Sequence, residues 1–262
     1  MPILILFLLG AAVGSFLNVC MIRIPMRESI AFPASHCLSC RRPIAWFDNI
    51  PIVSFFALKG RCRNCGSRIS WQYPAIEALT GFSFVLFFGV FGLTAKGILY
   101  LVLSLALLVV SVIDWKTQII PDVISLPGLA LGLAASIIFP GLHGAESWKG
   151  GLIQSAAGAF VGGGILALIG TLAERILKKE AMGGGDVKLL AMIGAFIGWR
   201  GILWTLFAGS FAGALIGMYL RVRKGEERIP FGPFLAFAAV SYLFFGERVW
   251  QWYLNTIGLT GA

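Results

Sequence analysis

Charged side chains are scarce in this 262-residue sequence: Asp, Glu, Lys and Arg make up only 13% of it, and only 12 residues are acidic. Hydrophobic residues account for 58%, and the mean hydropathy is +0.87. A water-soluble domain of this length does not need so many apolar residues to build one core. The shortage of charge therefore excludes a soluble protein and indicates an integral membrane protein.

The N-terminal segment also lacks the marks of a cleaved signal peptide. Residues 2–25, PILILFLLGAAVGSFLNVCMIRIP, have no basic n-region and no small-residue cleavage site followed by a polar chain. We therefore expect a retained first membrane span.

Apolar segments recur along the chain at lengths that suit helices crossing a hydrocarbon layer roughly 30 Å thick. We predict an all-α polytopic membrane protein with about eight transmembrane helices. The predicted spans are 3–22, 75–93, 97–113, 123–139, 151–173, 187–199, 201–220 and 231–246. At roughly 1.5 Å per residue the sixth reaches only about 20 Å, so a re-entrant segment is its alternative.

Basic residues outnumber acidic ones and give a net charge of +9. If the N-terminus lies outside, 17 of the 21 Lys and Arg fall in inner segments. The outer four are Lys96, Lys149, Arg200 and Arg248. This asymmetry follows the positive-inside rule and explains the basic balance without a nucleic-acid partner.

A polar insertion at residues 23–73 contains two C-x2-C pairs, CLSC at 37–40 and CRNC at 62–65. Each pair predicts a knuckle whose thiolates face one tetrahedral ion, although the 21-residue separation is slightly longer than the common zinc-ribbon range. Two disulfides are the weaker alternative, because the loop is expected in the reducing cytoplasm. We predict one structural zinc per chain in a cytoplasmic zinc-ribbon-like loop, held by Cys37, Cys40, Cys62 and Cys65.

Three other features have structural interpretations. His36, next to the first knuckle, is expected to face solvent rather than to compete as a ligand, and Cys20 to pack inside the first span. The stretch GGGILALIG at 162–170 lacks a preceding strand, so close helix packing is favoured over a nucleotide-binding loop.

Three carboxylates lie on predicted membrane boundaries: Asp114, Asp186 and Glu77. An ionisable group at such a place is expensive and is by default a functional candidate. Two crossings separate Asp114 from Asp186, so both belong on the cytoplasmic face and can meet. Two such aspartates can share one proton and activate water against an amide, as in an aspartic protease.

Simpler interpretations stay open at these positions. Asp186 is also a plausible N-terminal acid of a helix, with Gly183, Gly184 and Gly185 as an ordinary turn. Asp114 could pair with Lys116. Asp122 is assigned to the first turn of the fourth span, and Glu77 is left undecided between structure and function.

Four stretches together resemble the bacterial type IV prepilin peptidase family. They are GSFLNVCMIRIP at 14–25, residues 37–81 around the cysteines, IDWKTQIIPD at 113–122 and MGGGDVKLLAMIGAFIGW at 182–199. The resemblance implies a GxGD-type aspartic protease with Asp114 and Asp186 as catalytic residues, and Gly183, Gly184 and Gly185 in the motif. It also implies a three-part chain: a first helix at 1–22, the four-cysteine loop at 23–73 and a peptidase domain of about seven helices at 74–262.

The resemblance further implies a multi-pass protein of the bacterial inner membrane that removes the basic leader of type IV prepilins and type II secretion pseudopilins on the cytoplasmic side. Many members also N-methylate the new terminus with S-adenosylmethionine. Competing classes are a carboxylate-dependent transporter and a zinc-loop assembly factor without peptidase activity. The sequence leaves open the particular pilins, the methyl-donor site and the oligomeric state.

Overall fold

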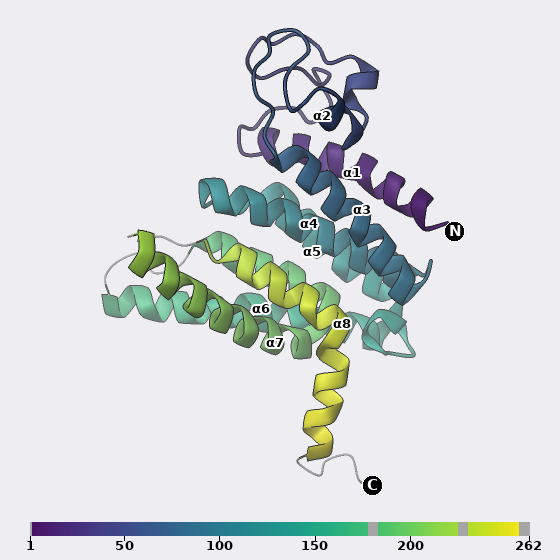
Figure 1. Ribbon diagram of the computed structural model, residues 1–262. Coiled ribbons are helices and arrows are strands. Elements are labelled where there is room, and N and C mark those ends of the chain that lie inside the picture. Colours follow the sequence, from purple (N-terminus) through teal and green to yellow (C-terminus); the bar gives the residue numbers. More distant parts are fainter. Residues whose placement is uncertain (1, 178–182, 225–229, 257–262) are drawn as a thin grey trace. The chain divides into compact units, whose positions relative to one another are not determined.

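The computed structural model describes residues 2–177, 183–224 and 230–256, and within these ranges it contains helices and no β-strand (Figure 1). Each predicted apolar span overlaps one of the long helices, which confirms the all-α membrane fold. These helices are α1 (Ile3–Arg23), α3 (Gln72–Phe91), α4 (Ala95–Thr117), α5 (Asp122–Ile138), α6 (Trp148–Leu177), α7 (Gly184–Lys224) and α8 (Gly232–Thr256).

Not every described helix has the length and hydropathy of a membrane span. Five do, namely α1, α3, α4, α6 and α7, and α5 is a shorter apolar helix of 17 residues. Helix α7 is interrupted at Gly198, where φ is 70° and ψ is 178°. The two predicted spans at 187–199 and 201–220 therefore meet at a glycine, the residue that adopts this conformation at least cost. The number of helices that cross the bilayer stays a prediction.

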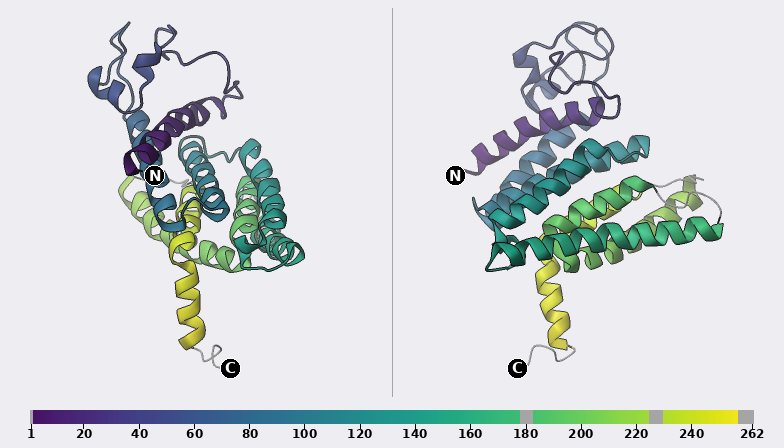
Figure 2. Two further views of the ribbon diagram at one scale, coloured as in Figure 1. Left: turned by 90° about the vertical axis from the view of Figure 1, so that its right-hand side faces the viewer. Right: turned by 180° about the vertical axis from the view of Figure 1, so that it is seen from behind.

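The chain divides into two compact units, Met1–Leu101 and Val102–Ala262. In the first unit, α1 and α3 lie side by side, as both sets of views show (Figures 1 and 2). Glycine makes this possible, because a Cβ on Gly10 would lie 2.8 Å from the Cα of Gly81. The Asn18 side chain, near the end of α1, donates to the carbonyl of Tyr73 at 3.2 Å. The polar loop thus leaves α1 and enters α3 at one boundary.

In the second unit, α6 and the first half of α7 pack through small residues. Gly158 and Gly194 touch backbone to backbone, and a Cβ on Gly162 would meet the Leu190 carbonyl at 2.5 Å. The buried Ser155 hydroxyl donates to the carbonyl of Ala195 at 2.7 Å. Small residues allow such close approach where lipid supplies no hydrophobic driving force. The interpretation of 162–170 as helix packing is therefore confirmed.

Candidate active site and metal centre

Asp114 lies near the C-terminal end of α4 and is only 5% exposed. Its Oδ2 accepts a hydrogen bond of 2.9 Å from the backbone N–H of Gly232, the first residue of α8. The first N–H groups of a helix have no partner within it and favour an anion. A Cβ on Gly232 would stand 2.7 Å from this oxygen, so only glycine permits the contact as it is. The carboxylate is therefore held by a helix N-terminus.

Asp186 lies in the first turn of α7. Its backbone N–H donates to the carbonyl of Gly183 at 3.1 Å. A Cβ on Gly185 would come within 2.8 Å of the Ile120 Cβ, whereas one on Gly184 would meet no atom within 4 Å. Neither Gly184 nor Gly185, the first two residues of α7, has a positive φ. Close approach of a neighbouring segment therefore requires glycine at position 185 and not at position 184.

The two aspartates come from different helices of the same unit, Asp114 from α4 and Asp186 from α7. The chain reverses after α4 at Gln118, whose φ is 55° and whose N–H donates to the Asp114 carbonyl at 2.8 Å. Ile120, in the same connection, contacts Gly185 as described above. This connection therefore ties the end of α4 to the start of α7.

An ion pair links the start of α7 to a third helix, α5. The Lys188 ammonium contacts both carboxylate oxygens of Asp122, at 2.7 and 2.8 Å. Asp122 is the first residue of α5, as expected, and Lys188 lies two residues after Asp186. Lys188 and Gly232 are absent from the site residues predicted from the sequence. For Gly232 a signal was present, since PFGPF at 230–234 places a glycine between prolines just before the last apolar segment.

The four loop cysteines form a cluster in which all sulfur atoms lie within 4.8 Å of one another. Cys37 Sγ is 3.8 Å from Cys65 Sγ, close to the edge of a sulfur tetrahedron around zinc with bonds of about 2.3 Å. All four are free thiols, and His36 is directed to the Ala34 carbonyl at 3.1 Å. The residues present fit a four-thiolate zinc site.

Hydrogen bonds from the knuckle backbone lower the pKa of the Cys37 thiol, but they do not make every cysteine of the cluster a thiolate. The N–H of Cys40, followed by the Ser67 hydroxyl, lowers the pKa of Cys37 to about 6. The N–H of Arg42 also lowers the pKa of Cys40, but burial and the neighbouring sulfurs of Cys37 and Cys65 outweigh it and raise that pKa to about 11. Four thiolates this close need a cation between them.

Two further acidic side chains, Glu77 and Asp48, have partners in the first unit. Glu77 is 7% exposed, and its Oε2 accepts a hydrogen bond of 2.7 Å from the N–H of Ile52, whose φ is 64°. Asp48 forms a bidentate pair with Arg63 at 2.7 and 2.8 Å, and the hydrogen bond from this guanidinium lowers the pKa of Asp48. Cys20 is buried in α1, as predicted. Glu77 thus anchors the loop to the helices.

Apolar helices, two carboxylates near helix ends and a four-thiol loop define a polytopic membrane protein. Comparison with known protein families narrows this class to one family. The model named "Bacterial Peptidase A24 N-terminal domain" matches residues 8–91, and the one named "Type IV leader peptidase family" matches residues 101–218. The chain belongs to the type IV leader peptidase family, which confirms the resemblance and the predicted class of enzyme.

Several curated relatives carry the name prepilin leader peptidase/N-methyltransferase. The Pseudomonas aeruginosa protein is 36% identical, with 98% of this chain and 94% of the relative aligned. The Pseudomonas putida protein is 34% identical over 95% and 93%. The Myxococcus xanthus protein is 38% identical over 84% of this chain, which spans 64% of that longer relative. No solved structure matches the chain.

Proposed function

We propose that this protein cleaves the basic leader of type IV prepilins and type II secretion pseudopilins by a two-aspartate mechanism. The observation that carries the proposal is the placement of two carboxylates at helix ends: the N-terminus of α8 holds Asp114, and Ile120, in the connection after Asp114, lies against Gly185 beside Asp186 at the start of α7. Both residues match the family motif stated above. The names of the relatives support prepilins as substrates.

The mechanism assigns a separate proton-handling role to each carboxyl group. Two acidic groups in one partly dry site share a proton, because like charges at close range cannot both ionise cheaply. Since an N–H donor binds a carboxylate better than a carboxylic acid, the Gly232 contact favours Asp114 as the ionised member. Asp114 then takes a proton from water as the oxygen attacks the amide carbon.

Asp186 completes the reaction as the member that carries the shared proton. It donates a hydrogen bond to the carbonyl oxygen as negative charge develops there. When the carbon–nitrogen bond breaks, the proton passes to the departing nitrogen. Hydrolysis leaves a carboxyl group on the leader and a free amino terminus on the pilin.

The second proposed step is N-methylation of that new terminus. The word N-methyltransferase in the names of the relatives supports it, and S-adenosylmethionine would supply the methyl group from its sulfonium. The amine must lose a proton before its lone pair can displace the thioether. Zinc, held by Cys37, Cys40, Cys62 and Cys65, would act structurally, because four protein thiolates leave no position for water.

We place the enzyme in the bacterial inner membrane with its site facing the cytoplasm, on the basis of the distribution of Lys and Arg. A prepilin would then pack its apolar helix against the enzyme within lipid and present the leader junction at the boundary. Water reaches a boundary site directly, so hydrolysis needs no separate path through the bilayer.

Leader removal by the purified protein tests the proposal. Asp114→Asn and Asp186→Asn should each lower the cleavage rate by about 10²–10⁴-fold, because neither group can take over the other's role. Glu146→Gln removes a carboxylate from an exposed position and serves as the matched control. Near-normal cleavage by either aspartate variant, with normal insertion and folding, would refute the pair.

A further inference from the structure

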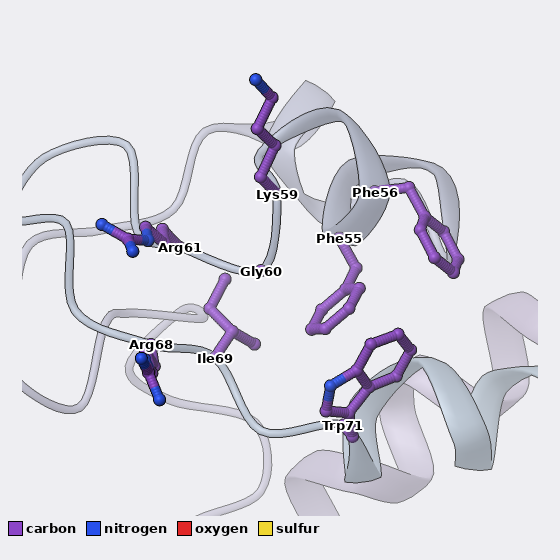
Figure 3. A pocket seen from close by; sticks show the side chains of 8 residues that line it. All are labelled: Phe55, Phe56, Lys59, Gly60, Arg61, Arg68, Ile69 and Trp71. Carbon is purple, nitrogen blue, oxygen red and sulfur yellow. The ribbon is translucent and has the colours of Figure 1, made fainter.

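A cavity of about 550 Å³ lies in the polar loop of the first unit, beside the start of α3 (Figure 3). Figure 3 shows three aromatic side chains on one side of it and Arg61 and Arg68 on the other. The lining residues are Phe55, Phe56, Lys59, Gly60, Arg61, Arg68, Ile69 and Trp71. The lining contains no acidic side chain.

The walls of the cavity are held in place by the loop backbone. Gly60 has a φ of 66°, and its N–H donates to the Phe55 carbonyl at 2.8 Å. Its own carbonyl accepts from the N–H of Ile69 at 2.8 Å. On the aromatic side, the ring centroids of Phe55 and Trp71 are 4.7 Å apart. The cavity is therefore a feature of the folded loop.

The cationic side of the cavity has an unbalanced charge. Arg61 and Arg68 lie opposite each other in an isolated antiparallel bridge, which places their side chains on one face. Like charges in this relation destabilise the pair. Within the part of the chain that the structure describes, no carboxylate forms an ion pair with either, in contrast to Arg63, which Asp48 neutralises. An anion at this point would relieve the repulsion.

The aromatic side of the cavity adjoins a membrane span. Trp71 is the N-cap residue of α3, a candidate span, so it lies one residue from the apolar segment. It is 67% exposed, and Phe56 beside it is 59% exposed. Tryptophan is enriched at the level of lipid headgroups, because its ring suits an interface between apolar and polar surroundings.

We propose that this cavity binds the phosphate headgroup of an acidic phospholipid from the bilayer around α3. Arg61 and Arg68 contact the phosphate, Lys59 adds positive charge, and Trp71 and Phe56 lie against the glycerol and upper acyl region. Basic pockets beside membrane spans bind such headgroups by this combination of charge and position. S-adenosylmethionine fits less well, because it carries a net positive charge and every charged side chain in the lining is a cation.

Native mass spectrometry of the full chain in neutral detergent tests the site, with phosphatidylglycerol and phosphatidylcholine added in equal amounts. The wild type should retain phosphatidylglycerol selectively. Arg61→Gln with Arg68→Gln should lower that selectivity on the order of tenfold or more. Arg41→Gln with Arg42→Gln removes the same charge from exposed positions of the same loop and should leave the selectivity unchanged.

Two further measurements make the result decisive. Zinc content should stay at the wild-type value in both double variants, and Lys59→Gln, which alters one exposed side chain, should give a smaller loss of selectivity than the Arg61 and Arg68 double variant. Equal retention by the two double variants would overturn the proposal. So would full displacement of phosphatidylglycerol by inorganic phosphate, or S-adenosylmethionine binding that requires Arg61 and Arg68. None of these readouts depends on leader cleavage.

Discussion

The backbone N–H of Gly232 and the Oδ2 of Asp114 lie 2.9 Å apart across 118 residues of sequence. We predict that Gly232→Ala lowers cleavage at least tenfold, because the new methyl group would stand 2.7 Å from the carboxylate oxygen and displace it. Gly89→Ala is the control, since a Cβ there meets nothing within 4 Å. Measured rates of leader removal that are equal for the two variants would contradict the prediction.

The motif glycines should differ from one another in their tolerance of a methyl group. Gly185→Ala would bring its Cβ within 2.8 Å of Ile120 and push the start of α7 away from the α4–α5 connection. Gly184→Ala meets no described atom within 4 Å. We expect the loss of cleavage to be several-fold greater for Gly185→Ala, since small displacements of a catalytic group cost large factors in rate. The reverse order would show that the motif acts in another way.

Replacing Cys37 and Cys40 together with Ser should remove the zinc, because two thiolates cannot complete its tetrahedral shell. Metal binding supplies folding free energy that so small a loop cannot obtain from its own core. Metal analysis should give about one zinc per chain for the wild type and for Cys20→Ala. The double variant should lose N-methylation to a greater extent than cleavage. Loss of cleavage on zinc removal from an intact loop would contradict a structural role.

Glu77 should control the order of the polar loop. Glu77→Ala removes the acceptor for the N–H of Ile52, and hydrogen bonds to charged groups contribute about 1.5–3 kcal/mol. Because Ile52 has a positive φ, which is unfavourable for a β-branched residue, we expect it to relax when the bond is lost. Hydrogen exchange across 44–58 should rise, whereas Glu28→Gln, at an exposed site, should leave it unchanged. Unchanged protection in Glu77→Ala would exclude this role.

Recognition of a basic leader would need acidic side chains on the enzyme, because most charged side chains of the polar loop are basic and repel it. Asp48, Glu28 and Glu77 are the candidates, but Asp48 pairs with Arg63 and Glu77 with Ile52. We expect the substrate to be cut after a glycine that ends its leader. Glu28→Lys should therefore slow cleavage when that leader carries Lys or Arg. The effect should vanish when those leader residues are replaced by Gln. Charge reversal at all three positions with no change in preference would remove this idea.

Residues that follow a repeating or motif pattern could be placed from the sequence. Apolar runs located the helices, and the spacing of the cysteines located a cluster whose sulfurs do meet. Counting crossings predicts that Asp114 and Asp186 lie on one face, and Ile120, in the connection after Asp114, does lie against Gly185 beside Asp186.

Contacts between distant segments could not be placed, because they depend on how helices dock. Gly232 reaches Asp114 only when α8 begins beside the end of α4, and Ile52 reaches Glu77 only when the loop folds back onto α3. The cavity beside Trp71 likewise depends on the turn at Gly60, which no periodic pattern in the sequence predicts.

The contact between Gly158 and Gly194 limits how this chain can vary over generations. Any side chain at either position would push α6 off the half of α7 that carries Asp186. A change at one glycine cannot be compensated by a smaller residue at the other, since neither has a side chain left to lose. We therefore expect these two positions to admit almost no substitution in a random library selected for activity, while neighbouring lipid-facing positions accept many apolar residues.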